Sequence, residues 1–331
     1  MFAVVLVGGF GTRLRPLTNE VPKPMLPVLH RPMIEHLVER LAAGGVTDVV
    51  LALGFKPEPF QTAFPDGRHG DVRVHYAVEP EPLDTAGAIG FAARAVGVDD
   101  TFVVANGDII CDLRFAELVD AHRAFGGDAT IHLKAVDDPS AFGVVELDDA
   151  GRVQRFVEKP APGESDSNLI NAGTYVMEPS VLDLIPQLER YSVERSVFPE
   201  LVGDGRLYGM STDDYWLDTG RPDQYLQANL DLIRGVRRDA VAGIHARASV
   251  SPEAIVVESV VGPDTTIEAG ATVADSLLLP GASVGAGSTV ERSIVAGVVT
   301  DRCVVTDSVV GAGHTVTPGT TVESRRLPDP G

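Results

Sequence analysis

The sequence predicts an α/β fold: a Rossmann-like, mostly parallel sheet with helices on both faces, followed by a separate stack of short strands. Two observations predict it. From Met1 to about Gly235, short β-branched runs alternate with amphipathic helical stretches, the pattern of a parallel sheet covered by helices. From Ile244 to Val322, apolar residues recur every six positions among Gly, Ala, Ser, Thr and Pro. We therefore place two domains, at residues 1–235 and 236–331.

The elements of the first domain follow from their residue patterns. A helix is expected over Pro32–Ala43, whose apolar residues share one face, and another over Leu113–Phe125. Ligands of open sheets bind beyond the carboxyl ends of the strands. The loop after the first strand and the turn Asn106-Gly107-Asp108 should therefore meet at one edge. The strands are predicted at Ala3–Val7, Val49–Leu53, Arg73–Ala77, Thr101–Ala105, Ala129–Lys134 and Val153–Phe156.

The second domain repeats every six residues. A repeat of this length lets each short strand stack an aliphatic side chain on the preceding one, which buries a core that no single repeat could bury. A β-sandwich, the alternative, predicts no fixed period. Five-residue steps, such as Leu279 to Val284, are interpreted as corners or slippage. The step of six is kept by Val261, Ile267, Val273 and Leu279, and again by Val304, Val310, Val316 and Val322.

Composition limits the partners and the location. Lys and Arg total 27 against 47 Asp and Glu, a net charge of −20, which argues against a nucleic-acid or anionic-membrane surface. The opening residues are not basic and the apolar stretch Phe2–Val7 is too short for a signal core, so a cytoplasmic protein is expected. Cys111 and Cys303 lack a CxxC spacing and are interpreted as reduced, partly buried residues.

One turn concentrates glycine and positive charge. The run GGFGTRLRPLT (Gly8–Thr18) and the following PKPM (Pro22–Met25) suit a polyphosphate, because glycines expose amide groups and Arg and Lys supply charge. A P-loop is excluded because no Gly-Lys pair follows, and a dinucleotide fingerprint because its third glycine position holds Leu14. A plain glycine turn between a strand and a helix is the alternative.

These motifs closely resemble the signature of the sugar-1-phosphate nucleotidyltransferases. Within that family the wording VGGFGTRLRPLT is most similar to bacterial mannose-1-phosphate guanylyltransferases with a C-terminal hexapeptide-repeat domain, and the resemblance runs essentially end to end. It implies that the tail is a left-handed parallel β-helix of about four to five coils, with three hexapeptides per coil. The implied reaction transfers a nucleoside monophosphate from a nucleoside triphosphate to a sugar-1-phosphate and releases pyrophosphate.

The resemblance also implies the nucleotide contacts. The triphosphate would lie over the amides of the signature glycines, with Arg13 and Lys23 against the oxygens where the leaving charge gathers. Base recognition is expected from Glu81–Ile89, where Asp84 stands at a position that is Gly in many relatives. That departure leaves the identity of the base open, whereas the sequence of the signature favours GTP. The implied nucleotide-binding residues are Val7, Gly8, Gly9, Gly11, Thr12, Arg13, Lys23, Thr85, Ala86, Gly87, Asn106 and Gly107.

Metal and sugar contacts follow from the same resemblance. Asp108 in NGD and Asp218 in YWLDTGRPDQY are implied to hold Mg²⁺, and with Arg13 and Lys23 they form the implied catalytic set. No nucleophilic side chain is required, because the sugar phosphate oxygen is already an anion. The implied sugar-phosphate residues are Gly143, which lets the backbone approach the ring, Glu158 for hydroxyls, Lys159 for the phosphate, and Asn171 and Thr174.

Other interpretations stay open. The same reaction could use an ADP-, UDP- or dTDP-glucose type of substrate pair or a cyclitol phosphate, and a non-catalytic regulator could bind nucleotide sugars with the same residues. Acetyl transfer by the tail is a further alternative. It would need a catalytic histidine, and His245 and His314 are the only histidines of the tail. The flat aliphatic faces of stacked coils suggest a homodimer or a higher homo-oligomer.

Overall fold

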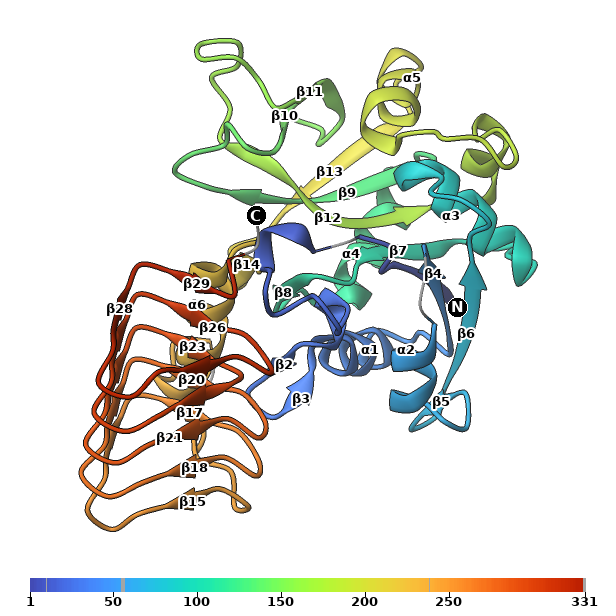
Figure 1. Ribbon diagram of the computed structural model, residues 1–331. Coiled ribbons are helices and arrows are strands. Elements are labelled where there is room, and N and C mark those ends of the chain that lie inside the picture. Colours follow the sequence, from blue (N-terminus) through green and yellow to red (C-terminus); the bar gives the residue numbers. More distant parts are fainter. Residues whose placement is uncertain (10, 55–56, 238, 330–331) are drawn as a thin grey trace. The chain divides into compact units, whose positions relative to one another are not determined.

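The computed structural model describes residues 1–9, 11–54, 57–237 and 239–329 (Figure 1). The chain forms two compact units. Unit 1 comprises Met1–Gly9 and Ile34–Trp216, and unit 2 comprises Phe10–Met33 and Leu217–Gly331. Two segments of the predicted first domain, 10–33 and 217–235, thus belong to unit 2. The predicted boundary between the two domains, at residues 235 and 236, stays a prediction.

The centre of unit 1 is a parallel sheet. Its central strands follow the order β7–β1–β4–β6, each parallel to its neighbours. They match the predicted strands to within one residue: β1 (Phe2–Leu6), β4 (Asp48–Leu53), β6 (Val72–Val78) and β7 (Phe102–Asn106). The register pairs Leu6 with Asn106, so β1 and β7 end side by side. The loop after β1 and the turn after β7 therefore meet at one edge, as the sequence predicted.

Antiparallel strands widen this sheet. β12 pairs with β7 in the antiparallel sense, so the start of β12 lies beside the end of β7. The predicted strands beginning at 129 and 153 correspond to β9 and β11, whereas β10, β12 and β13 were not predicted. The bounds are β5 (Arg68–His69), β9 (Ala129–Ala135), β10 (Gly143–Leu147), β11 (Val153–Glu158), β12 (Leu169–Met177) and β13 (Leu207–Ser211).

Both faces of the sheet are buried. Val4 of β1 lies in one core with residues of α3 and α5, while the alternation of strand side chains sends Ala3 and Val5 to the opposite face, where both are fully buried. α4 packs on β9 and β12. The remaining bounds are α1 (Met33–Ala43), α2 (Glu58–Ala63), α3 (Asp84–Ala95), β8 (Ile109–Cys111), α4 (Phe115–Phe125), η3 (Pro179–Leu184), η4 (Val193–Val197) and α5 (Phe198–Gly203). The two helices predicted from sequence are α1 and α4.

Unit 2 contains a parallel β-helix of five coils, drawn in orange and red in Figure 1. Each coil gives one strand to each of three five-stranded sheets. The first sheet is β15 (Ser249–Val250), β18 (Thr266–Ile267), β21 (Ser283–Val284), β24 (Val298–Val299) and β27 (Thr315–Val316). The second is β16 (Ile255–Val257), β19 (Thr272–Ala274), β22 (Thr289–Glu291), β25 (Val304–Thr306) and β28 (Thr321–Glu323). The third is β17 (Val260–Val261), β20 (Leu277–Leu278), β23 (Ile294–Val295), β26 (Val309–Val310) and β29 (Arg326–Leu327).

The coils are shorter than three hexapeptides. A column of serines shows this, because each accepts a hydrogen bond from an amide 17, 17, 15 and 17 residues further on in successive coils. One step in each 17-residue coil, and two steps in the 15-residue coil, therefore have fewer than six residues. For this reason two predicted positions were wrong: Leu279 lies outside the interior core and Val304 is 40% exposed. Their neighbours Leu278 and Val305 lie in the core instead.

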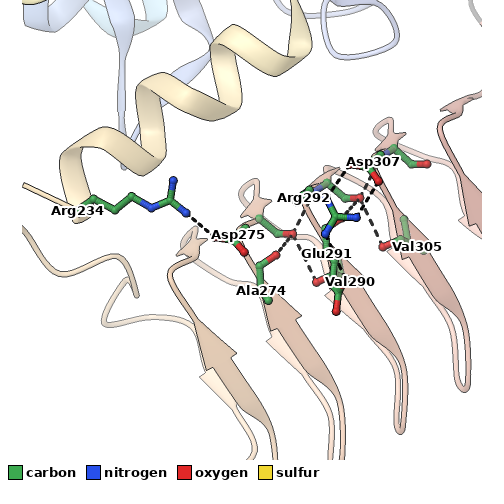
Figure 2. Close-up of polar contacts among 11 residues, drawn as sticks. Arg234, Ala274, Asp275, Val290, Glu291, Arg292, Val305 and Asp307 are labelled. Carbon is green, nitrogen blue, oxygen red and sulfur yellow. Dashed lines mark hydrogen bonds and ion pairs between the residues drawn. The ribbon is translucent and has the colours of Figure 1, made fainter. Parts of the chain in front are cut away.

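A second column stabilises the same corner. Glu258, Asp275, Arg292 and Asp307 occupy successive coils, and each has a positive φ between 41° and 50°. Arg292 donates two hydrogen bonds to Asp307, at 2.8 and 2.9 Å, and Arg234, just beyond the end of α6, pairs with Asp275 (Figure 2). Ion pairs of opposite charge thus link this column from Arg292 to Asp307 and from the end of α6 to Asp275.

The early segment of unit 2 folds against α6 (Pro222–Ile233). The Leu29 amide donates to the Asn229 side chain at 2.7 Å, and the Tyr225 hydroxyl donates to the Pro27 carbonyl at 2.5 Å. The segment contains two single-turn helices and one small hairpin, and β14 precedes α6. Their bounds are η1 (Thr12–Leu14), η2 (Lys23–Met25), β2 (Pro27–Val28), β3 (Arg31–Pro32) and β14 (Trp216–Asp218).

Candidate functional site

The first part of the signature turn lies at the carboxyl edge of the sheet in unit 1. A Cβ at Gly8 would stand 3.1 Å from the Gly54 nitrogen, so the close approach of these two strand ends favours glycine. Gly9 is exposed, and a Cβ there would meet nothing within 4 Å. Gly8 is therefore required by packing, whereas Gly9 leaves space that a ligand can occupy.

The turn after β7 lies directly beside this loop. The Gly107 amide donates to the Leu6 carbonyl at 2.9 Å, and a Cβ at Gly107 would stand 2.6 Å from a methyl group of Val7. Asp108 follows at the same edge and is partly exposed. The structure therefore brings the predicted residues Val7, Gly8, Asn106, Gly107 and Asp108 together.

The beginning of β12 adds predicted sugar contacts to this edge. Thr174 pairs with Ala105 of β7 and is buried. Asn171 uses both ends of its amide within the chain: it donates to the Tyr175 hydroxyl at 3.0 Å and accepts from the Gly173 amide at 2.9 Å. Asn171 is thus held in one orientation beside the end of β7.

Glu158, Lys159 and Gly143 form a neighbouring group. The register pairs Gly143 with Glu158, and a Cβ at Gly143 would stand 3.0 Å from a carboxylate oxygen of Glu158. The Lys159 ammonium lies 3.8 Å from the same carboxylate, and its side chain is 62% exposed. A cation for a phosphate and a carboxylate for hydroxyl groups therefore stand next to each other.

Glu194, which the sequence analysis missed, connects the base segment to the sugar segment. It accepts hydrogen bonds from the hydroxyls of Thr85 at 2.7 Å and Ser192 at 2.8 Å. Burial raises the pKa of Glu158, and the charge of Glu194 raises it further. Burial likewise raises the pKa of Tyr175, with a contribution from Glu194. Glu194 lies in the turn η4, and no motif in the sequence marks it.

The predicted base segment begins α3. Asp84 has φ +61°, a conformation that favours glycine and that Asp tolerates better than most other residues. The amides of Ala86 and Gly87 both donate to the Tyr191 carbonyl, and a Cβ at Gly87 would stand 2.5 Å from the Glu189 carbonyl. The small residues of this segment are therefore required by packing within unit 1.

Unit 2 brings together the predicted cations and the second carboxylate. The Lys23 side chain is only 6% exposed, and its ammonium lies 3.4 Å from Asp218, 195 residues away. A Cβ at Gly220 would stand 3.0 Å from both the Arg13 guanidinium and the Asp218 carboxylate. Gly11, with φ +58°, precedes the turn Thr12–Leu14 that carries Arg13. Arg13, Lys23 and Asp218 thus form one cluster in unit 2.

Comparison with known proteins identifies the family. Residues 2–235 match the family model described as nucleotidyl transferase, which is more than half of the chain. The chain belongs to the nucleotidyl transferase family. Residues 234–312 match the model described as a GlmU-like C-terminal hexapeptide. The fold of this nucleotidyl transferase, a sheet with helices followed by a hexapeptide-repeat β-helix, is therefore the one predicted from sequence.

The relatives of this nucleotidyl transferase include enzymes of one kind. It is 42% identical over 278 residues to a mannose-1-phosphate guanylyltransferase of Mycobacterium tuberculosis, covering 81% of this chain and 77% of that protein. It is 45% identical over 230 residues to a mannose-1-phosphate guanyltransferase of Aspergillus oryzae, covering 68% of this chain and 62% of that protein. The chain thus spans less than two thirds of the fungal relative. The crystal structure of HddC from Yersinia pseudotuberculosis complexed with GMP-PN is 29% identical, with a TM-score of 0.59 over 69% of this chain and 97% of that chain.

Members of this family use a divalent metal ion. Asp108 and Asp218 suit one chemically, because carboxylate oxygens are preferred by hard divalent cations and neither residue is fully buried. Within residues 1–9, 11–54, 57–237 and 239–329, no group of three or more His, Cys, Asp and Glu is placed to hold a metal.

Two further sequence predictions can be compared with the structure. Cys111 and Cys303 are both buried and are not joined in a disulfide. Among the described helices, none combines the length and the apolar character needed to cross a bilayer.

Proposed function

We propose that this nucleotidyl transferase forms GDP-mannose from GTP and mannose-1-phosphate and releases pyrophosphate. The names of the relatives in Mycobacterium and Aspergillus support these substrates, as does the amino-acid sequence of the signature. The observation that carries the proposal is the cluster in unit 2, where the signature residues Arg13 and Lys23 lie with Asp218 of a segment about two hundred residues away. Such a cluster suits the binding of a polyphosphate.

The proposed reaction is an in-line displacement. A phosphate oxygen of the sugar phosphate forms a bond to the α-phosphorus, and the bond from that phosphorus to the bridging oxygen breaks. The electron pair leaves with pyrophosphate. Arg13 and Lys23 neutralise the charge that develops on this leaving group, where a fixed cation stabilises the transition state most. Asp108 and Asp218 would hold Mg²⁺, which supplies further neutralisation of the phosphate oxygens.

The sugar phosphate would bind beside β10, β11 and β12. We assign its phosphate to Lys159 and its hydroxyl groups to Glu158, with Asn171 fixed beside them. Gly143 would contribute through its backbone, because a side chain there would meet the Phe156 ring at 2.5 Å. We keep Thr85, Ala86 and Gly87 as the proposed base segment, with Thr85 as its partly exposed residue. Gly8, Gly9, Gly11 and Thr12 would line the triphosphate.

A substrate matrix tests the proposal. The purified chain is incubated with Mg²⁺, each common nucleoside triphosphate and several sugar-1-phosphates, and pyrophosphate release is measured. GTP with mannose-1-phosphate is expected to be fastest, and no release is expected without the sugar phosphate. Faster turnover with another pair would correct the substrates, whereas nucleotide-sugar binding without any turnover would indicate a regulator instead.

A carboxylate series tests the metal proposal. Asp108→Ala and Asp218→Ala are each expected to lower turnover at least about a hundredfold while the protein stays folded, because each removes one metal ligand. Asp213→Ala is the matched control, since Asp213 is an exposed carboxylate five positions before Asp218. Chelation with EDTA followed by Mg²⁺ should abolish and then restore activity. Full activity in both variants would reject the assignment.

Two broader predictions complete the proposal. We expect the protein in the cytoplasm, where nucleoside triphosphates are made and where its two cysteine thiols stay reduced. We also expect a homodimer or a higher homo-oligomer formed through the flat faces of the β-helix. A monomer in light scattering at micromolar concentration would contradict the second expectation.

A further inference from the structure

We infer that the last coil of the β-helix holds the signature turn in position, and that Arg326 is the positioning residue for Arg13. This inference rests on the proposed role of Arg13 toward the triphosphate. Arg326, in β29, donates a hydrogen bond from its guanidinium to the Arg13 carbonyl at 2.8 Å across 313 residues of chain. The final coil of unit 2 therefore contacts the turn that carries a catalytic cation.

A second contact joins the same two segments. A Cβ at Gly311 would stand 2.7 Å from both Cβ and Cγ of Pro16, so the ring of Pro16 lies directly on the backbone of Gly311. The Gly311 amide in turn donates to the Leu327 carbonyl at 2.7 Å, which connects this contact to β29. Pro16 is buried. Gly311 and Arg326 thus support the turn at two points three residues apart in the chain, Arg13 and Pro16.

The turn needs such support because it is short. Thr12–Leu14 is a single turn of 3-10 helix with no side-chain cap, and its internal bonds are those of the Leu14 and Arg15 amides to Gly11 and Thr12. A turn of this length has little stability of its own. The buried Leu14 anchors one side, and the hydrogen bond from Arg326 fixes the carbonyl of the residue whose guanidinium lies near Gly220 and Asp218.

The consequence concerns function as well as folding. If Arg326 orients Arg13, the β-helix contributes to triphosphate binding and does more than connect subunits. A loss of this contact should weaken the contacts of Arg13 with the triphosphate and leave those of the sugar phosphate unchanged, since Glu158 and Lys159 belong to unit 1. The two Michaelis constants therefore respond differently to the same substitution.

The test compares two neighbouring arginines. Arg326→Ala is expected to raise the KM for the nucleoside triphosphate about three- to tenfold, while the KM for the sugar phosphate changes less than twofold. Arg325→Ala is the matched control: it removes the same charge from an exposed side chain of the same coil and should leave both constants unchanged. Arg326→Lys keeps a charged donor and should recover part of the loss. Melting temperatures of the three variants should agree within a few degrees.

A second readout separates this inference from the proposed function. Amide hydrogen exchange over residues 11–18 of the full chain should be faster in Arg326→Ala than in Arg325→Ala, whether or not the enzyme turns over. Equal exchange and equal KM values in the two variants would overturn the inference. A parallel rise of both KM values with a lower melting temperature would also overturn it, because that result describes a loosened fold. If the wild-type chain turns over no substrate pair, the proposed function fails, and the exchange rates still show whether the last coil holds the turn.

Discussion

Substitution of Lys23 by Met separates the catalytic role of this residue from its structural one. The Lys23 side chain is 6% exposed and its ammonium lies 3.4 Å from Asp218, whose side chain is 22% exposed. Methionine has a similar length and suits a buried position, so Lys23→Met removes the charge with little change of volume. The structure therefore allows the effects on stability and on rate to be worked out separately.

The two magnitudes differ. At 3.4 Å the attraction between the two charges is about 5 kcal/mol with an effective dielectric constant of about 20. Lys23→Met gives up this attraction but also removes the cost of burying the Lys23 ammonium, which is several kcal/mol, while the Asp218 carboxylate stays 22% exposed to water. These terms largely cancel, so the free energy of unfolding should change by no more than about 2 kcal/mol. One fixed cation acting on the leaving pyrophosphate is worth about 3 to 4 kcal/mol in the transition state. We therefore expect kcat to fall about 100- to 1,000-fold.

The assay measures initial rates of pyrophosphate release together with urea unfolding curves. Arg40→Met is the matched control, because Arg40 forms a comparable, partly exposed ion pair with Asp112 at 2.8 Å in unit 1 and has no role in the proposed reaction. Its kcat should stay within about threefold of the wild-type value. Lys23→Met with more than a tenth of the wild-type kcat would refute the reasoning, because a cation that acts on the leaving group cannot be removed at so small a cost.

Three further predictions follow from other contacts. Burial, and after it the charge of Glu194, raises the pKa of Glu158 above its ordinary value of 4.5. We therefore expect kcat/KM for the sugar phosphate to fall at acid pH as Glu158 becomes protonated, and Glu194→Gln to move that fall to lower pH. An unchanged pH profile would disprove the coupling. Gly87→Ala should destabilise the chain by about 1 to 3 kcal/mol in urea unfolding, because the new Cβ would stand 2.5 Å from a backbone carbonyl; wild-type stability would be inconsistent with this packing. The hydrogen bonds from Arg73 hold the pKa of Asp48 well below its ordinary 3.8, so Asp48 contributes stability at neutral pH that is lost as the pH falls below 3.8. Arg73→Gln should therefore make the free energy of unfolding less dependent on pH in this acid range. An equally steep dependence in the variant would exclude the contribution.

Patterns short enough to be local were predictable. The four central strands of unit 1 were placed to within one residue. Three of them, β1, β4 and β7, are mostly buried apolar runs, whereas β6 mixes buried apolar residues with exposed and polar ones. Knowing that parallel strands end at one edge was then sufficient to predict that Gly8 and Asp108 lie at the same side of the sheet. The hexapeptide period likewise predicted a stacked tail, because each repeat forms the same short strand.

Other features depended on residues far apart in the sequence. The presence of Asp84 could be noticed in the sequence, but only the backbone shows that this residue has a φ of +61°, a conformation that favours glycine. Glu194 has no motif and becomes part of the candidate site only because it accepts a hydrogen bond from Thr85, 109 residues away. The interior positions Leu278 and Val305 depended on coils of 17 and 15 residues, which the contacts between coils set.

The amino-acid order was sufficient for the family, the two kinds of architecture and the chemical types in each motif, since these depend on neighbouring residues and on regular spacing. Tertiary packing decided which distant groups meet: Lys23 with Asp218, and Arg326 with the carbonyl of Arg13. A contact of that kind is worth about 1 kcal/mol alone and leaves no periodic trace in the sequence. It forms because the rest of unit 2 has already brought the two segments together.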